Sequence, residues 1–221
     1  MHKEIKTYFE EIAADFDSYY ENPKGFIDKI INAWLRRPGL IRRLNISLLA
    51  TDPKKGKKIL DVGCGSGKFV VECAKKGAEV YGIDISKEMI ELAKDFCLKN
   101  KVEASLRVGD ATQELPKDFD VCVALGVFEY FENPKPLLKK MFLSTKEAGK
   151  IIFSVPSLLA LQTPLRKILL RYRKVKCYYY TKNRIKSLIY DFKEKIKNIE
   201  FISYGPGYVV CLELKEFVKD N

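Results

Sequence analysis

A glycine-rich turn holds the residues whose types and spacing are best suited to binding a ligand. Gly63, Gly65 and Gly67 follow the apolar run of residues 59–62, so a buried strand is expected to break into a turn almost free of side chains. Without a Cβ atom the backbone reaches positive φ and approaches a bound molecule closely, and the helix that follows directs unpaired N–H groups toward it. Asp61 adds a negative charge at the end of the strand. The turn therefore suits a polar, partly cationic ligand better than a polyphosphate.

Three other kinds of glycine-rich loop compete with this interpretation. A dinucleotide fingerprint G-x-G-x-x-G would need glycine at position 68, where Lys68 stands. The phosphate-binding pattern G-x-x-x-x-G-K-[ST] lacks its glycine spacing here, and Phe69 follows the lysine. A turn that only packs a helix on a sheet stays open as an explanation, and the residues around the turn must decide it.

Three later strands are expected to end in groups that could bind the same ligand. Asp84 stands 23 residues after Asp61, about where an acidic residue accepts hydrogen bonds from both hydroxyls of a ribose. Asp110 and the small Ala111 can meet the edge and the face of a flat base. The fourth strand ends just above the same cleft in the segment Leu125-Gly126-Val127-Phe128-Glu129-Tyr130.

Asp84 and Asp110 each have an ordinary structural explanation as well. Asp84 could cap a helix together with Ser86, and Asp110 could close a turn. Compatible groups at four strand ends, at the expected separations, nevertheless favour a bound cofactor with a sugar and a base.

The elements that must position these residues alternate along the chain. We expect strands at 58–62, 78–83, 104–109, 119–125 and 149–155, with helices at 66–76, 86–99 and 134–146. Alternation with short links predicts a parallel sheet covered on both faces, with the ligand beyond the carboxyl ends of the strands. A helix at 181–192 and strands at 196–203 and 207–215 follow, and Gly205-Pro206-Gly207 predicts an antiparallel hairpin between the two strands.

Two further segments flank this pattern in the single expected domain, residues 1–221. Residues 1–55 are expected to form an N-terminal arm with helices at 3–21, from about 24 to Pro38 and at 39–50. This arm packs as an extra layer or forms a lid. The cofactor-binding core follows at 57–156. Residues 157–176 read as a basic amphipathic helix in an insert that ends at 180, before the last helix and hairpin at 181–221. This helix could cover the substrate, touch anionic lipid, bind RNA or only pack on the surface.

Composition limits the class of protein. The net charge of +11 lies mainly in residues 160–200, which hold 12 basic and 3 acidic side chains, so nucleic acid, an anionic membrane surface and an acidic substrate are all candidate partners. Six scattered cysteines and one histidine show no metal-ligand spacing, so no metal is expected. We expect a cytoplasmic protein, because the N-terminus is charged and no apolar run approaches the ~18 residues of a membrane span.

The four strand-end motifs together resemble a known family. ILDVGCGSGKF, VYGIDIS, RVGDA and FDVCVALGVFEYFENP are similar, in order and spacing, to the signatures of class I S-adenosylmethionine-dependent methyltransferases. The resemblance implies an α/β fold with a Rossmann-like, mostly parallel seven-stranded sheet and an antiparallel last strand. It also implies S-adenosylmethionine as cofactor and S-adenosylhomocysteine as product. The matching cofactor-binding positions are Asp61, Gly63, Cys64, Gly65 and Gly67 for the methionine part, Asp84 and Ile85 for the ribose, Asp110, Ala111 and Met89 for the adenine, and Leu125 and Gly126 beside them.

Catalysis in such an enzyme needs few groups. Methyl transfer from a sulfonium is an in-line displacement, so holding the acceptor close to the methyl carbon in a dry site supplies much of the acceleration. Members of the family often show Glu-His where this chain has Glu129-Tyr130. Tyr130, Glu129 and Tyr20 of the N-terminal arm are therefore the candidates to orient or deprotonate an acceptor hydroxyl.

The acceptor is expected to be a small molecule. The chain lacks the [DN]-P-P-[YF] turn that is typical of methyltransferases acting on exocyclic nitrogens of bases. Its layout resembles the branch of the family that methylates quinone precursors and tetrapyrrole carboxylates. We expect O- or C-methylation of a lipophilic or anionic metabolite. Two alternatives stay open: an RNA-binding or RNA-modifying enzyme that uses the basic insert, and a non-catalytic protein that binds the cofactor or serves as a partner subunit.

Overall fold

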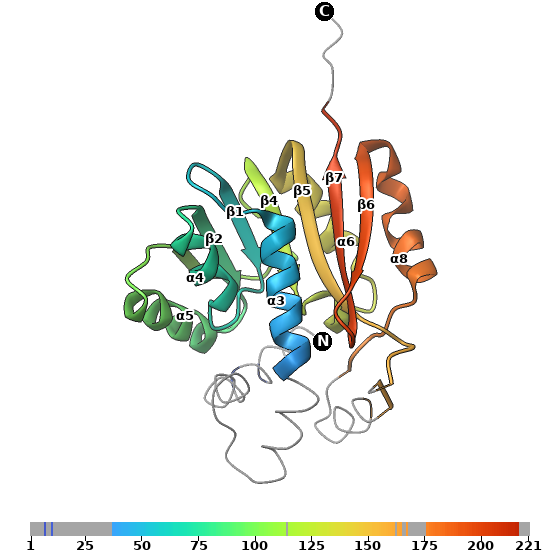
Figure 1. Cartoon of the computed structure of the whole chain (residues 1–221), viewed down its shortest axis with the longest axis horizontal. Helices are drawn as coiled ribbons and strands as arrows, with labels where there is room; N and C mark the ends of the chain where they lie inside the picture. The colour runs from blue at the N-terminus through green and yellow to red at the C-terminus, as the bar shows by residue number, and fades with distance from the viewer. Residues whose placement is uncertain are drawn as a thin grey trace, which may run out of the picture.

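The core of the protein is a mixed sheet of seven strands (Figure 1). The computed structural model describes Thr7, Glu10, residues 37–113, 115–161, 163, 164, 167 and 176–216. The strands occur in the order β3-β2-β1-β4-β5-β7-β6, and β7 runs antiparallel to both β5 and β6, whereas the other pairs are parallel. Their bounds are β1 Lys58–Val62, β2 Glu79–Asp84, β3 Ser105–Val108, β4 Phe119–Leu125, β5 Thr145–Pro156, β6 Ile196–Ser203 and β7 Gly207–Leu214.

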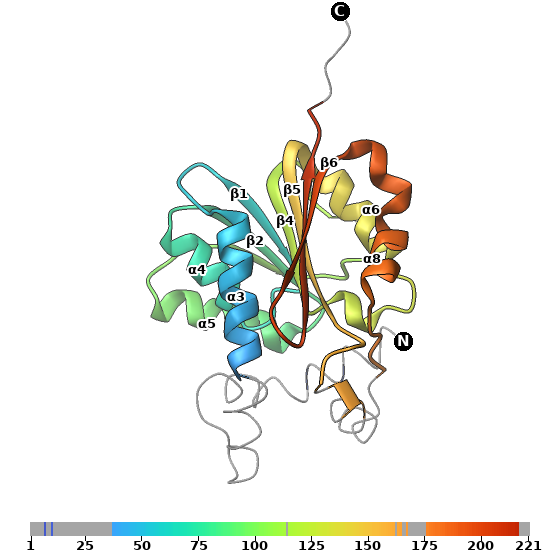
Figure 2. The same ribbon diagram turned by 45° about the vertical axis from the view of Figure 1, so that its right-hand side comes forward.

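Helices cover both faces of the sheet (Figures 1 and 2). One face carries α3 (Arg37–Thr51), α4 (Lys68–Lys75) and α5 (Lys87–Lys99), and the other carries α6 (Lys135–Ser144) and α8 (Lys182–Ile189). Two short 3-10 helices complete the described elements, η3 (Phe128–Tyr130) after β4 and η4 (Tyr190–Lys195) after α8.

The strand sequences follow from this burial on two sides. In β4, Cys122 and Ala124 lie in the hydrophobic cluster under α6 and α8, whereas Val121 and Val123 lie in the cluster under α3, α4 and α5. Because alternate side chains of a strand point to opposite faces, a strand covered on both sides is apolar at its buried positions. The run FDVCVAL, apolar at every position except Asp120, therefore forms a strand with the bounds that we expected.

The first turn of α3 is held by the tip of the β6–β7 hairpin. A Cβ atom added at Gly39 would lie 2.7 Å from Pro206 Cγ, so the Gly39 backbone packs against the Pro206 ring too closely for a larger residue. Pro206 in turn accepts a hydrogen bond from Ser157 N at 2.9 Å, just after β5. The start of α3 is thereby placed beside the carboxyl end of β5, at the lower edge of the sheet in Figure 1.

Most predicted elements are confirmed with shifted bounds, and three of the shifts have a clear structural cause. Helix 66–76 begins only at Lys68, because Gly67 at its N-cap has a left-handed φ of 80°. β5 begins at Thr145 rather than 149, because Thr145 already pairs with Phe119 of β4. The helix expected at 181–192 ends at Ile189 and continues as η4.

The basic helix expected from residue 157 does not begin there. Leu158 N donates to Tyr180 O at 2.9 Å and Thr163 Oγ1 donates to Ser157 O at 2.7 Å, so the chain makes a closed turn after β5. Most of the later insert and most of the arm lie outside the described residues, although Thr7 and Glu10, within the helix expected at 3–21, are helical. The expected break between a helix that ends at Pro38 and one that begins at 39 is wrong, because α3 already begins at Arg37 and runs through Pro38. Among the helices of the described chain, none is long and apolar enough to cross a bilayer.

Candidate functional site

The glycine turn, residues 63–67, is fixed on the carboxyl end of β2. Gly63 N and Cys64 N both donate to Ile83 O, at 2.7 and 3.1 Å, and Gly65 N donates to Asp84 Oδ2 at 2.9 Å. All three glycines of the turn have positive φ, with values of 72°, 51° and 80°. Side chains other than glycine are strained in this region, so the sequence folds here into a turn with few side chains, whose glycines 63 and 65 are half-buried.

Gly63 also makes room for its neighbours. A Cβ atom on this residue would overlap the side chain of Val127, which follows β4. At the end of the turn, a Cβ atom on Gly67 would lie 2.9 Å from Ala93 Cβ of α5. The turn thus brings the ends of β1, β2 and β4 together, as the sequence predicted.

Asp84 is a structural acceptor for the turn. Its Oδ1 accepts from Ser86 N at 3.0 Å and its Oδ2 from Gly65 N at 2.9 Å, while burial raises the pKa of this carboxyl. Ser86, not Asp84, caps α5, because its hydroxyl accepts from Met89 N at 3.1 Å. Each carboxylate oxygen has capacity for a second hydrogen bond, so the predicted role at a ribose fits this geometry. Ile85 is half-buried and Met89 is fully buried.

Asp110 lies at the end of β3 and does close a turn. Its Oδ1 accepts from both the backbone N and the hydroxyl of Thr112, at 2.8 and 2.7 Å. Gly109 N donates to Asp84 O at 2.8 Å, which ties the end of β3 to the end of β2. Ala111 is half-buried beside them. The role of Asp110 and Ala111 at an adenine stays a prediction.

Asp61 and Arg43 bring opposite charges to this edge of the sheet. Asp61 is 2% exposed, and burial together with the nearby Asp84 carboxylate raises its pKa to about 7, while the Arg43 guanidinium acts in the opposite direction. Arg43 reaches this place from α3: a Cβ atom on Gly126 would lie 2.7 Å from its Nη1. Gly126 has a φ of 76° and donates its N–H to Ser154 Oγ at 2.8 Å.

The sequence prediction missed Arg43. Its position depends on how α3 docks on the hairpin tip, and no local motif around the residue signals that contact. The only sequence cue was an arginine pair on the helix that precedes β1. Leu125 and Gly126, which were predicted, lie beside it, and both are half-buried.

The raised pKa of Asp61 predicts a pH-dependent stability. Between the ordinary pKa of 3.8 and the folded value of about 7, the folded state holds a proton that the unfolded state has released. The free energy of unfolding should therefore fall by up to a few kcal/mol as the pH rises through this window. Asp61→Asn, which stays neutral, should lessen that fall in urea titrations at about pH 5 and about pH 8. An unchanged slope would show that Asp61 is ionised throughout. The buried Asp84, whose pKa is also raised, contributes to the slope that remains in the variant.

The candidate catalytic residues lie in η3, directly after β4. Glu129 is 3% exposed, and Tyr130 is half-buried and donates its N–H to Val127 O at 3.1 Å. The segment that ends the insert is fixed to the same helix, because Tyr178 N donates to Glu129 O at 2.7 Å. The structure thus brings Glu129 and Tyr130 to the same edge as the glycine turn, whereas Tyr20 lies outside the described residues.

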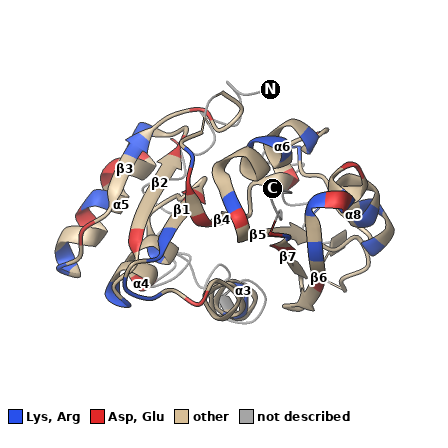
Figure 3. Ribbon diagram, turned by 90° about the horizontal axis from the view of Figure 1, so that it is seen from above, with Lys and Arg blue, Asp and Glu red and all other residues tan. Residues whose placement is uncertain are grey.

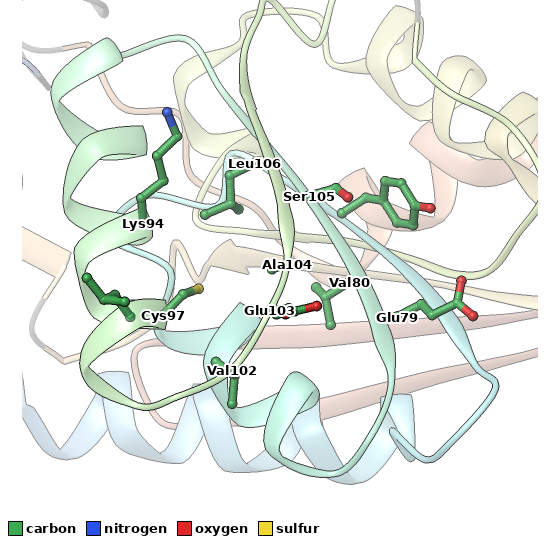
Figure 4. Close-up of a pocket in the computed structure, with 11 residues that line it drawn as sticks. Glu79, Val80, Lys94, Cys97, Val102, Glu103, Ala104, Ser105 and Leu106 are labelled. Atoms are coloured by element: carbon green, nitrogen blue, oxygen red, sulfur yellow. The ribbon is translucent and has the colours of Figure 1, made fainter.

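A cavity of about 540 Å³ lies elsewhere, at the amino ends of β2 and β3 and along α5 (Figure 4). Its lining residues include Lys94, Cys97, Val102 and Glu103. The predicted cofactor residues follow the carboxyl ends of the strands, so this cavity is not the candidate site.

Viewed from above, lysines and arginines mark α5, α6 and α8 on the outside of the molecule (Figure 3).

Comparison with known proteins identifies the family of this chain. A family model described as a methyltransferase domain matches residues 53–200. Ubiquinone biosynthesis O-methyltransferase from Idiomarina loihiensis is 33% identical over 107 residues, which is 47% of this chain and 44% of that protein. The same enzyme from Pseudomonas fluorescens is 34% identical over 102 residues, 45% and 44% of the two chains. The matched region spans a little less than half the length of these relatives.

Solved structures share the fold over nearly the whole chain. Magnesium protoporphyrin IX methyltransferase from Synechocystis PCC 6803 with bound S-adenosylhomocysteine superposes with a TM-score of 0.74, at 21% identity, over 96% of this chain and 98% of that one. A methyltransferase from Haloferax volcanii, solved in complex with the activator Trm112, gives 0.68 at 14% identity over 94% and 98%. The predicted α/β architecture with a seven-stranded sheet is confirmed. Since the family model covers well over half of the chain, this protein belongs to the methyltransferase domain family, and its resemblance to class I S-adenosylmethionine-dependent methyltransferases is confirmed.

Proposed function

We propose that this protein transfers the methyl group of S-adenosylmethionine to a small-molecule acceptor, by O- or C-methylation. The observation that carries the proposal is the glycine turn fixed on Asp84, with the Arg43 guanidinium seated on Gly126 beside it. In this assignment Arg43 binds the carboxylate of the methionine part, and the backbone of the turn binds the rest of that part. Asp84 accepts from the ribose hydroxyls, and Asp110 and Ala111 lie at the adenine.

The residues of the chain need to do little chemistry. Bound S-adenosylmethionine supplies an electrophilic methyl group, and the protein holds the acceptor in line with it and excludes water. Glu129, buried in η3 above the end of β4, is the nearest candidate to take a proton from an acceptor hydroxyl. Tyr130, half-buried next to it, is the candidate to orient that hydroxyl.

The choice of a small-molecule acceptor draws support from the relatives. The curated ones are named for ubiquinone biosynthesis and a structural neighbour for magnesium protoporphyrin IX. Incubating the protein with methyl-labelled S-adenosylmethionine and a cell extract tests the choice, because the small-molecule, RNA and protein fractions can be counted separately. Label in the small-molecule fraction is the expected result. Label in RNA would favour the alternative based on the basic insert, and cofactor binding without any transfer would favour a non-catalytic role.

We also propose peripheral contact with an anionic membrane, through the turn that follows β5. Leu159 is 80% exposed and Leu161 is fully exposed, and the hydrogen bonds from Thr163 and Leu159 to Ser157 hold the turn that presents them. Lys167 and Lys176 nearby in the sequence are exposed. Exposed leucines next to lysines are the composition that binds the surface of anionic bilayers.

This contact predicts binding to lipid vesicles. The protein should sediment with vesicles that contain anionic phospholipid and not with purely zwitterionic vesicles. Replacing both Leu159 and Leu161 with serine should remove most of the binding, because both side chains lose the apolar surface that would enter the bilayer. Leu98→Ser is the matched control, since Leu98 is 78% exposed but lies on α5. Equal binding by the double variant and the control would contradict the proposal.

A further inference from the structure

The hydroxyl of Tyr178 is a buried polar group that the proposed function does not yet explain. Its oxygen atom is shielded from solvent and has no hydrogen-bond partner in the structure of the described residues. The ring packs against the hydrophobic cluster under α6 and α8. A buried hydroxyl without a partner destabilises a fold, and phenylalanine would fill the same space without that penalty. A tyrosine at this position is therefore explained if its hydroxyl forms a hydrogen bond to a bound ligand.

Tyr178 is attached to the candidate catalytic helix. Its N–H donates to Glu129 O at 2.7 Å, and the hydroxyl of Tyr180 donates to Phe128 O at 3.1 Å. Both contacts fix the segment 178–180 to η3, which follows the carboxyl end of β4. The backbone of Tyr178 is thus held beside η3, at this end of the sheet.

Glu129, Tyr178 and Tyr180 also interact electrostatically. Burial raises the pKa of Tyr180 to about 12; the Arg184 guanidinium opposes this rise, and the Glu129 charge and the Tyr178 hydroxyl add to it. Arg184 Cζ lies 4.6 Å from the centre of the Tyr180 ring and 6.0 Å from that of Tyr178. Glu129 and the hydroxyl of Tyr178 therefore both lie near the Tyr180 hydroxyl, and the first can accept hydrogen bonds while the second can donate one.

We propose that Tyr178 and Glu129 together bind the methyl-accepting group of the substrate, and that this group is a hydroxyl and not a carboxylate. A hydroxyl satisfies both residues, because it donates to the Glu129 carboxylate and accepts from Tyr178. A carboxylate would meet the negative charge of Glu129 in a buried site, where like charges repel strongly. This inference rests on the proposed methyltransferase function.

The transfer balances with these two residues. The acceptor oxygen forms a bond to the methyl carbon as the bond from that carbon to sulfur breaks. The electron pair of the broken bond neutralises the sulfonium and leaves a thioether. The proton of the acceptor hydroxyl passes to Glu129, and the product is a methyl ether.

The chemistry of the labelled product tests the nature of the acceptor. Wild-type protein is incubated with methyl-labelled S-adenosylmethionine and the small-molecule fraction of a cell extract. We expect label that resists alkali and is released by hydriodic acid, which identifies a methyl ether. Label released by alkali would identify a methyl ester, and label that resists both reagents would show that the methyl group is not bound to oxygen; either result overturns the inference while the methyltransferase function stands. Absence of label here and in every fraction of the whole extract would remove the proposed function and the inference with it.

Variants test the two residues directly in the same assay. Tyr178→Phe should reduce the rate of label transfer by roughly ten-fold or more, because one hydrogen bond to the acceptor is lost. Its melting temperature should equal or exceed that of the wild type, and its affinity for S-adenosylhomocysteine should not change. Glu129→Gln should also slow transfer, whereas Tyr190→Phe, at a 62% exposed position on η4, should change nothing. A Tyr178→Phe variant that transfers label at the wild-type rate would refute the role of this hydroxyl.

Discussion

Asp84→Ala is expected to weaken the binding of S-adenosylhomocysteine by about 30-fold or more, which corresponds to more than ~2 kcal/mol. The carboxylate is proposed to hold the ribose hydroxyls, and it also accepts the N–H groups of Gly65 and Ser86 at 2.9 and 3.0 Å. Its removal therefore loses the contact with the ligand and also frees the glycine turn from β2. Titration calorimetry measures the first effect, and the melting temperature measures the second.

Asp120→Ala is the matched control for this experiment. Asp120 likewise accepts a backbone N–H, that of Lys58 at 2.8 Å, but it lies at the opposite end of the sheet, near the start of β1 and β4. Its loss should reduce stability and leave the affinity for S-adenosylhomocysteine unchanged. If Asp84→Ala bound the ligand as tightly as the wild type, the assignment of Asp84 to the ribose would be wrong.

Arg43→Gln should lower the affinity for S-adenosylhomocysteine by roughly ten- to hundred-fold, while the affinity for 5′-methylthioadenosine stays the same. The two ligands share the adenosine part, but 5′-methylthioadenosine lacks the amino-acid carboxylate. The Arg43 guanidinium, which lies against Gly126, is proposed to pair with that carboxylate, so only S-adenosylhomocysteine loses an interaction in the variant. Calorimetry with both ligands on one preparation gives the ratio directly.

Arg42→Gln provides the control on the same helix. Arg42 is exposed and lies near Gly205 of the hairpin tip, with Nη1 3.8 Å from the position of an added Cβ, and not at Gly126. This variant should change neither affinity. Equal losses for both ligands in Arg43→Gln would mean that the residue supports the whole site rather than the carboxylate.

Short-range features of the fold were predictable from the sequence. The turn at residues 63–67 was expected because alternating glycines can adopt positive φ, and all three do. The hairpin at Gly205-Pro206-Gly207 was expected from its turn residues, and β6 and β7 are antiparallel there. Ser86 was recognised as part of a helix start, and its hydroxyl caps α5. In each case the physical cause lies within a few residues of the effect.

Features that depend on distant contacts were not predictable in the same way. Arg43 reaches Gly126 only because Gly39 and Pro206 fix the start of α3 on a hairpin formed at the other end of the chain. The polar start of β5, residues 145–148, showed no strand pattern, although Thr145 pairs with Phe119. The leucines after residue 157 have helical spacing, but Leu158 N donates to Tyr180 O, so the chain first makes a turn, and the described residues 163, 164 and 167 that follow are helical. Tertiary hydrogen bonds outweighed local pattern at both places.

Titration calorimetry of the wild-type protein with S-adenosylhomocysteine tests the central claim most directly. The site at the carboxyl ends of β1, β2 and β4 predicts saturable binding at one site per chain, with S-adenosylmethionine competing for it. Absence of binding by both compounds at millimolar concentration would contradict the account, because the glycine turn, Asp84 and Arg43 would then form no cofactor site.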